Sequence, residues 1–388
     1  MFSARVPPLR SNRLARVLAR LRAEGRELLD LTTSNPTTVG LTYPPDLLAP
    51  LSASAGLVYR PHPFGHPEAR RAVAEELADR GVRVSPERIV LTASTSESYA
   101  LLFKLLCDPG DLSLVPQPSY PLFDHLTRLE GVVASPYPLE YHGRWQIDLD
   151  SVERRLEPRV RALLMVNPNN PTGSWVTADE LQRLRTLAAA HDIALLSDEV
   201  FDRYPWDPTR PGPSGALVDD PDVLTFTLGG LSKAVGLPQL KLGWVVVGGP
   251  DRLARPALER LELICDSYLS VSTPVQLALG TLLETARPVA DQIRDRVRAN
   301  LGALAETLPD YPAIQHLGAD GGWYAVIQVP TRGSEEALVI RLAEEDGVLV
   351  HPGYFFDFPR ESFLVLSLLP PLPRFRDALT RVLTRASG

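Results

Sequence analysis

The sequence has few of the residues that mark disulfide-rich, metal-binding or membrane-spanning proteins. Its two cysteines, Cys107 and Cys265, lie far apart in apolar, helix-like sequence, which predicts buried reduced thiols and excludes a disulfide framework. The seven histidines form no HExxH motif and no cluster with cysteine, so no metal site is expected. No apolar run reaches about 18 residues, and no membrane-spanning helix is expected.

An excess of positive charge is also missing. The chain has 40 lysine and arginine residues against 47 aspartate and glutamate residues, a formal net charge of −7. Nucleic acid and anionic membranes are therefore not expected as main partners. The arginine-rich N-terminus superficially resembles a transit peptide, but its apolar residues recur at the spacing of a docked amphipathic helix: Leu14, Val17, Leu18 and Leu21. The expected compartment is the cytoplasm.

The chain does have the length and composition for a large buried core. It contains 388 residues, 44 % of them hydrophobic, which is enough for a large domain and a smaller companion. Between residues 85 and 250, short apolar runs alternate with helix-period segments such as 181–190, whose start carries the capping box Thr177 and Glu180. This alternation predicts a three-layer α/β domain with strands covered on both faces. The expected strands are 88–92, 112–115, 162–166, 193–197, 223–227 and 242–247.

The pattern changes after a long helical stretch at about 251–309. Strand-like runs then alternate with two helix-like segments, which predicts a small α+β domain. The expected strands there are 323–329, 348–351 and 363–368, and the expected helices are 335–346 and 374–385. The predicted organisation is an N-terminal segment at 1–45 that joins the small domain, a large domain at 46–290 and the small domain at 291–388.

The strongest chemical motif is Gly-Gly-Leu-Ser-Lys-Ala-Val-Gly-Leu-Pro at 229–238, followed by Lys-Leu-Gly-Trp at 241–244. A single lysine is usually a solvated surface residue. Lys233, however, comes directly after an expected strand and among small residues that let a ligand approach the backbone. An amine that forms a Schiff base needs a lowered pKa and a position beside a bound aldehyde. Lys233 is the candidate for that chemistry.

Two further motifs follow expected strands. Asn-Pro-Asn-Asn-Pro-Thr-Gly at 167–173 could be only a turn-rich loop. Ser-Asp-Glu-Val-Phe at 197–201 places Asp198 at the end of a buried strand, where a carboxylate without a partner would be costly. A carboxylate beside a pyridine nitrogen keeps that nitrogen protonated, which makes the ring an electron sink.

Two hydroxyl-bearing turns complete the set. Thr-Ala-Ser-Thr-Ser-Glu at 92–97 joins a strand to a helix that begins near Ser96, and such a turn either caps the helix or binds phosphate at its N-terminus. Pro-Ser-Tyr-Pro at 118–121 carries Tyr120, which is either a core residue or an aromatic ring that stacks on a ligand.

Taken in order, these motifs resemble those of fold-type I pyridoxal-phosphate aminotransferases of class I/II, over nearly the whole chain. The resemblance implies the PLP-dependent transferase fold, with a large α/β/α domain whose mixed sheet is mostly parallel. It implies that Lys233 holds pyridoxal 5′-phosphate as a Schiff base and moves protons, that Asp198 pairs with the pyridinium, and that Asn170 bonds the phenolic oxygen. The remaining implied cofactor-binding residues are Ser94, Thr95, Ser96, Tyr120, Phe201, Ser232, Lys241 and Tyr59. In the family, the tyrosine matched by Tyr59 reaches the phosphate of a neighbouring subunit, so a homodimer is expected.

The chain departs from the family pattern at four positions. Phe201 stands where tyrosine is common, which predicts a higher pKa of the Lys233 Schiff base than in relatives with tyrosine. Lys241 stands eight residues after Lys233, where the family has arginine, and Gly230 replaces a frequent serine. Val365 lies where an arginine usually binds the substrate carboxylate, and valine cannot form that bidentate contact.

The missing arginine leaves two alternatives open. Either another cation binds the carboxylate, with Arg360, Arg374 and Arg376 nearest in sequence, or the substrate is held in another way. Aromatic residues of the tail could line a hydrophobic pocket or only pack in the core: Trp323, Tyr324, Tyr354, Phe355 and Phe356.

The expected activity is transfer of an amino group from an α-amino acid to a 2-oxo acid. A rival hypothesis keeps the same cofactor chemistry but breaks another bond, as in a C–S lyase, a decarboxylase or a biosynthetic cyclase. A ligand-sensing regulator on the same fold would need a DNA-binding domain, and no helix-turn-helix segment precedes the first elements of the fold.

Overall fold

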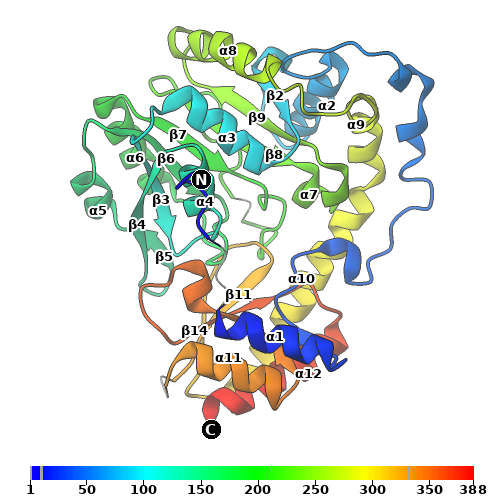
Figure 1. Ribbon diagram of the computed structural model, residues 1–388, viewed down its shortest axis with the longest axis vertical. Helices are drawn as coiled ribbons and strands as arrows, with labels where there is room; N and C mark the ends of the chain where they lie inside the picture. The colour runs from blue at the N-terminus through cyan, green and yellow to red at the C-terminus, as the bar shows by residue number, and fades with distance from the viewer. Residues whose placement is uncertain (1, 9–11, 211, 331–332) are drawn as a thin grey trace.

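A large sheet organises the upper body of the computed structural model, which describes all residues except 1, 9–11, 211 and 331–332 (Figure 1). Its eight strands are ordered β2-β9-β8-β7-β6-β3-β4-β5. Strands β8, β7, β6, β3 and β4 run parallel, whereas β9 is antiparallel to both of its neighbours and β5 is antiparallel to β4. The strands are β2 Ile89–Thr92, β3 Leu112–Gln117, β4 Val133–Tyr141, β5 Trp145–Ile147, β6 Val160–Val166, β7 Ala194–Asp198, β8 Thr225–Gly230 and β9 Gly243–Gly248.

Both faces of this sheet are buried, as the continuous apolar runs predict. Successive residues of β6 alternate between two separate cores: Leu163 and Met165 belong to one, and Leu164 and Val166 to the other. One face is covered by α3 Thr95–Leu106, α4 Phe123–Leu129 and α8 Asp251–Asp266. The opposite face is covered by α2 Pro67–Ala78, α5 Leu149–Arg154, α6 Ala178–His191 and α9 Thr273–Thr285.

The six strands expected between residues 85 and 250 are all confirmed, with ends shifted by up to three residues. The capping box of α6 is also confirmed, because Thr177 and Glu180 exchange side-chain and backbone hydrogen bonds. The sequence does not predict strands β4 and β5. Strand β4 contains two prolines and alternates buried with exposed residues near the sheet edge, so its sequence lacks the apolar run that marks the central strands.

The lower body in Figure 1 contains a second, antiparallel sheet ordered β10-β11-β14-β13. Its strands are β10 Gln315–Leu317, β11 Tyr324–Gln328, β13 His351–Pro352 and β14 Phe363–Ser367. Helices α1 Arg13–Ala23, α11 Glu335–Glu344 and α12 Leu372–Ser387 lie around it, and α10 Arg287–Thr307 extends along both bodies. The N-terminal strand β1 Leu29–Asp30 pairs with β12 Val348–Leu349, so the start of the chain is tied to the smaller body.

Short helices connect the larger elements. One of them, α7 Leu231–Ala234, follows β8 directly and carries Lys233. The 3-10 helices are η1 Pro36–Thr38, η2 Ala49–Ser52, η3 Ser54–Leu57, η4 Pro86–Arg88, η5 Pro238–Leu240, η6 Leu308–Asp310 and η7 Gly353–Phe356. None of the helices in the described part of the chain combines the length and apolar character needed to cross a membrane.

The parallel part of the sheet brings the predicted motifs together. Strands β3, β6, β7 and β8 end at the same edge of the sheet, because parallel neighbours place their carboxyl ends on one side. The segments that leave these ends carry Tyr120, Asn170, Asp198 and Lys233. This edge faces the smaller body, and it is the candidate active site.

Candidate active site

Lys233 lies among aromatic rings at this edge. Its Nζ atom is 4.8 Å from the ring centroid of Trp323 and 5.6 Å from that of Phe201. The two rings meet edge to face, with centroids 5.2 Å apart. The backbone carbonyl of Lys233 accepts a 2.5 Å hydrogen bond from the Tyr204 hydroxyl, which fixes the turn that carries the lysine. Burial lowers the pKa of Lys233 to about 8, an effect that the nearby carboxylate of Asp198 partly offsets.

Asp198 ends β7 and is only 7 % exposed. Its Oδ2 accepts a 2.7 Å hydrogen bond from the Tyr99 hydroxyl, and its Oδ1 accepts one of 3.1 Å from the backbone N–H of Val200. Burial raises the pKa of Asp198 to about 6, while the hydrogen bonds and Lys233 act in the opposite direction. The carboxylate is therefore mostly ionised at neutral pH, and its direction is fixed by two donors.

The loop at 167–174 is rigidly held around Asn170. The side chain of Asn169 bonds the Ser119 hydroxyl at 2.9 Å and Thr172 Oγ1 at 2.8 Å. Gly173 has φ of +69°, and a Cβ atom there would lie 2.5 Å from the carbonyl oxygen of Gly321, so the close approach requires glycine. Asn170 is itself buried, yet its Oδ1 has no hydrogen-bond partner among the described residues. Such an orphaned polar atom is expected where a ligand supplies the partner.

The hydroxyl-rich turn at 92–97 opens helix α3. Ser94 is the N-cap, and its Oγ accepts from the N–H of Glu97 at 3.2 Å. The first intrahelical bond runs from Ser98 N–H to the Ser94 carbonyl, so the N–H groups of Thr95 and Ser96 precede it and can face an anion. Ser94 therefore caps helix α3, as one of the two interpretations of this turn predicts. The cap uses the N–H of Glu97 and leaves the N–H groups of Thr95 and Ser96 available for a phosphate group.

Glycines let three segments meet beside this turn. A Cβ at Gly243 would lie 3.1 Å from the Gly229 carbonyl oxygen and 3.3 Å from the backbone carbon of Ser94. A Cβ at Gly230 would lie 3.1 Å from the Cα of Gly243, which accounts for glycine where the family often has serine. Strands β8 and β9 are therefore packed too closely at this end for side chains at Gly230 and Gly243.

The remaining predicted cofactor residues lie at different depths. Ser232 is partly buried on α7, and Lys241 is exposed just before β9 with a left-handed φ of +51°. Tyr120 follows β3, contacts Phe123 edge to face at 5.9 Å, and is 37 % exposed. Tyr59 is 75 % exposed in a segment with other apolar surface residues, and no contact in the described part of the chain brings it to Lys233.

The arginines nearest to Val365 in sequence are engaged elsewhere. Arg374 pairs with Glu27 and Arg376 pairs with Glu306, both on the surface of the smaller body. The guanidinium of Arg360 lies over the ring of Phe363, 5.5 Å from its centroid. Within the residues that the structure describes, none of the three contacts the group around Lys233, so the alternative in which one of them binds the carboxylate is not supported.

Three residues around the site carry no distinguishing sequence signal. Tyr99 lies on the inner face of α3 and Tyr204 in the segment after β7, where each could equally be a core tyrosine. Trp323 belongs to a group of aromatic residues for which the sequence predicts either a pocket or core packing. Their contacts with Asp198 and Lys233 join segments about 30 to 100 residues apart, which no local pattern reveals.

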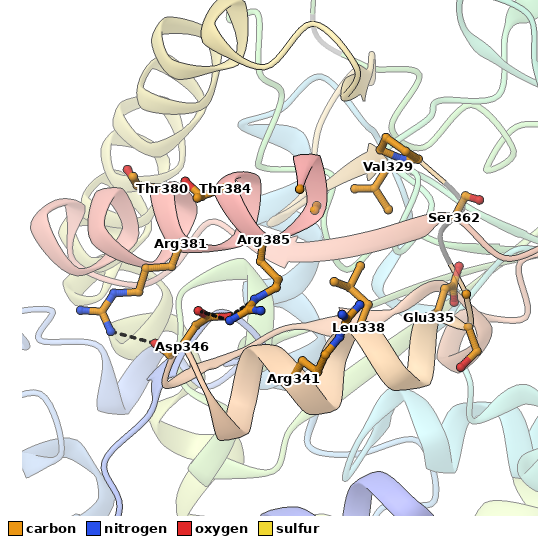
Figure 2. Close-up of a pocket in the computed structure, with 15 residues that line it drawn as sticks. Val329, Glu335, Leu338, Arg341, Asp346, Ser362, Thr380, Arg381, Thr384 and Arg385 are labelled. Atoms are coloured by element: carbon orange, nitrogen blue, oxygen red, sulfur yellow. Dashed lines mark hydrogen bonds and ion pairs between the residues drawn. The ribbon is translucent and has the colours of Figure 1, made fainter.

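A separate cavity of about 620 Å³ lies in the smaller body between α11 and α12 (Figure 2). Figure 2 shows Arg381 and Arg385 of α12 directed at Asp346, and Arg385 bonds both carboxylate oxygens of that residue. None of its described lining residues belongs to the group around Lys233. This cavity is not part of the candidate active site.

Comparison with known proteins gives one consistent result. Residues 31–371 match the model of the family "aminotransferase class I and II". The chain is 27 % identical over 380 residues to glutamate-pyruvate aminotransferase AlaA of Escherichia coli, covering 95 % of this chain and 93 % of the relative. It is 28 % identical to alanine aminotransferase of Mycobacterium tuberculosis, covering 91 % and 84 %. An aspartate aminotransferase mutant of Thermus thermophilus has the same fold, with a TM-score of 0.85, 26 % identity and 99 % coverage of both chains.

The residues at the sheet edge fit pyridoxal 5′-phosphate. The buried amide group of Asn170 can donate from Nδ2 to a phenolic oxygen, and the partly buried amine of Lys233 can condense with an aldehyde. The N–H groups of Thr95 and Ser96, which precede the first intrahelical bond, suit a phosphate group together with the closely packed glycines beside them. The buried Asp198 suits a protonated ring nitrogen. The amine of Lys233, the carboxylate of Asp198 and the anion-binding N-terminus of α3 thus lie at the same edge of the sheet.

Proposed function

Because the chain belongs to the aminotransferase class I and II family, we propose that the sheet edge around Lys233 is the active site of its amino-group transfer. The enzyme is a PLP-dependent transaminase that moves an amino group from an α-amino acid to a 2-oxo acid. The observation that supports the site assignment is the position of the Lys233 amine over the rings of Phe201 and Trp323, where the Asp198 carboxylate also raises its pKa.

Each residue has a separate task in this proposal. Lys233 would hold the cofactor covalently, and Asp198 would hold a proton on the ring nitrogen. Asn170 would bond the phenolic oxygen, Tyr120 would cover one face of the ring, and Ser94, Thr95, Ser96, Ser232 and Lys241 would bind the phosphate. When bound, the cofactor supplies an electron sink for the negative charge that develops at the substrate Cα.

Lys233 is suited to move the proton at that carbon atom. Because its pKa is lowered to about 8, a useful fraction of its amine is unprotonated near neutral pH and can accept the Cα proton. Phe201 and Trp323 exclude water from the amine and restrict its direction. Tyr99 keeps the Asp198 carboxylate aimed by its 2.7 Å hydrogen bond.

A screen of amino donors tests the proposed function. Each donor is added without an oxo acid, and loss of the cofactor's absorbance is followed together with formation of the corresponding 2-oxo acid. L-Alanine and L-glutamate are the first donors to test, since the relatives include alanine and glutamate-pyruvate aminotransferases. Stoichiometric release of oxo acid supports the proposal. Release of a cleaved or decarboxylated product instead would support the lyase or decarboxylase alternative.

Phe201→Tyr should lower the pKa of the Lys233-linked chromophore. Phe201 is buried and lies close to Lys233, so a tyrosine hydroxyl at this position can donate a hydrogen bond to the phenolic oxygen. A hydrogen bond to a charged acceptor contributes roughly 1.5–3 kcal/mol, so the titration midpoint should fall by about one pH unit or more. Absorbance titration of the wild type and of Phe201→Tyr measures the two midpoints. Identical midpoints would contradict the role given to position 201.

We propose a homodimer in which Tyr59 of one subunit reaches the phosphate in the neighbouring site, which accounts for its exposure in the single chain. A fully active monomer in sedimentation experiments would refute this. We also propose that the chain divides into segments 1–45, 46–290 and 291–388 and that the protein is cytoplasmic.

A further inference from the structure

The smaller body contributes an aromatic wall close to Tyr120. Its members are Tyr324, His351, Phe355 and Phe356. The imidazole of His351 stacks on Phe355 with ring centroids 4.9 Å apart, and it meets Phe356 edge to face at 5.4 Å. Phe356 also contacts Tyr324, with centroids 6.2 Å apart. The backbone N–H of Ser119, beside Tyr120, donates to the Phe356 carbonyl at 3.1 Å, so this wall borders the proposed active site.

The sheet register places His351 directly beside Val365. Val365 pairs with His351 of β13 on one side and with Val326 of β11 on the other. Residues opposite each other in an antiparallel sheet project from the same face, with Cβ atoms about 5 Å apart. Tyr324 and Ser367 form another pair of the same ladder, two residues along, and share that face. His351 is the only residue of β11, β13 and β14 that can become a cation.

The substrate of an aminotransferase brings a carboxylate that needs donors. A carboxylate removed from water without charged or hydrogen-bonding partners is strongly unfavourable. Valine offers none, and the three arginines near it in sequence are engaged elsewhere. The face around Val365 instead offers the imidazole of His351 and the phenol of Tyr324, which hydrogen-bonds Ser34.

We propose that His351 and Tyr324 bind the carboxylate of the substrate in place of an arginine, and that His351 takes up a proton from solvent when the carboxylate binds. This inference rests on the proposed function, because it assumes an α-amino acid in the site around Lys233. Tyr324 donates its hydroxyl proton to one carboxylate oxygen, and the imidazolium of His351 donates to the carboxylate as a charged partner.

The groups around His351 explain why the proton arrives with the substrate. Burial lowers the pKa of His351, and the Asp30 carboxylate and the hydrogen bond to the Thr32 carbonyl only partly oppose this. Val365 of β14 and the phenyl rings of η7 carry no charge. Helix α11 presents Glu335, whose carboxylate is already bonded by the backbone N–H groups of Tyr354 and Phe363. An arriving carboxylate adds negative charge, favours the imidazolium and raises the pKa again.

Substitution of His351 by glutamine should change KM in a pH-dependent way. KM and kcat are measured from pH 5.5 to 9 with the best donor of the screen, for the wild type and for His351→Gln. The KM of the variant is divided by the KM of the wild type at each pH. Titration of the donor's amino group and of the Lys233 linkage affects both proteins equally and therefore cancels in this ratio. The variant's KM should be about tenfold higher at the acid end, and the ratio should approach one as the pH rises. Values of kcat should agree within about twofold.

His316→Gln provides the matched control. His316 is a second partly buried histidine of the same sheet, also with a lowered pKa, but it lies on β10 at the opposite edge. Its KM ratio should stay near one at every pH. Tyr324→Phe should raise KM several-fold at all pH values with kcat retained, because a phenol stays neutral throughout this range.

Proton uptake by the wild-type holoenzyme gives a test that needs no variant. The 2-oxo acid product of the donor is bound to the PLP form and measured calorimetrically in two buffers of different ionisation enthalpy near pH 7.5. Uptake of a substantial fraction of a proton supports the inference, and its absence overturns it. A KM ratio for His351→Gln that does not vary with pH also overturns it. Failure of every amino acid to react with the wild type would instead refute the proposed function, so the two failures are distinguishable.

Discussion

Lys233→Ala should eliminate the covalent cofactor adduct and reduce kcat/KM by at least about 10²–10⁴-fold, the usual contribution of a positioned proton-transfer group. In the proposed function this amine condenses with the cofactor aldehyde, and it lies over the rings of Phe201 and Trp323. The adduct is trapped by borohydride and located by peptide mass spectrometry. A colourless variant without a trapped adduct is the expected result.

The chain makes this experiment unusually clear because it contains only three lysines, at 104, 233 and 241. Lys104 pairs with Glu130 on the outer side of α3, so Lys104→Ala is the matched control and should retain the adduct and the turnover. An adduct mapped to Lys104 or Lys241 in the wild type, together with normal turnover by Lys233→Ala, would show that another amine carries the chemistry.

Asp198→Asn should lower kcat by about 10²–10³-fold while the cofactor remains bound, because the amide keeps the shape of the carboxylate but cannot hold a proton on the ring nitrogen. Tyr99 and Val200 would still contact the side chain, so the local backbone should persist. Loss of the carboxylate also removes the interaction that raises the pKa of Lys233, so that pKa should fall further below its ordinary value. Single-turnover kinetics with an amino donor measure the loss of catalytic rate.

Glu199→Gln is the control for Asp198→Asn. Glu199 is the adjacent buried acid, and burial, assisted by Asp202, raises its pKa to about 8. Its carboxyl group is therefore mostly protonated at pH 7, and glutamine reproduces the uncharged form. Glu199→Gln should retain turnover within a few-fold. Equal losses in both variants would mean that any polar change in this segment disturbs the site, and would remove the special role of Asp198.

The sequence by itself determined the framework and the chemical groups. Each central strand is a local apolar run, and the residues that follow it are neighbours in the chain, so Tyr120, Asn170, Asp198 and Lys233 could be assigned to strand ends. The parallel order of those strands then required their carboxyl ends to lie at one edge. The edge strand β5 and its neighbour β4 are not predicted, because β5 has only three residues and β4 contains two prolines and few buried residues.

Only the tertiary structure decided which side chains act on those groups. The hydrogen bond from Tyr99 to Asp198, the position of Trp323 over Lys233, and the pairing of His351 with Val365 join segments distant in the chain. Such contacts depend on how the smaller sheet packs against the larger one and on strand register, and neither leaves a periodic pattern in the sequence. The packing also engaged Arg374 and Arg376 in surface ion pairs, which sequence proximity to Val365 could not reveal.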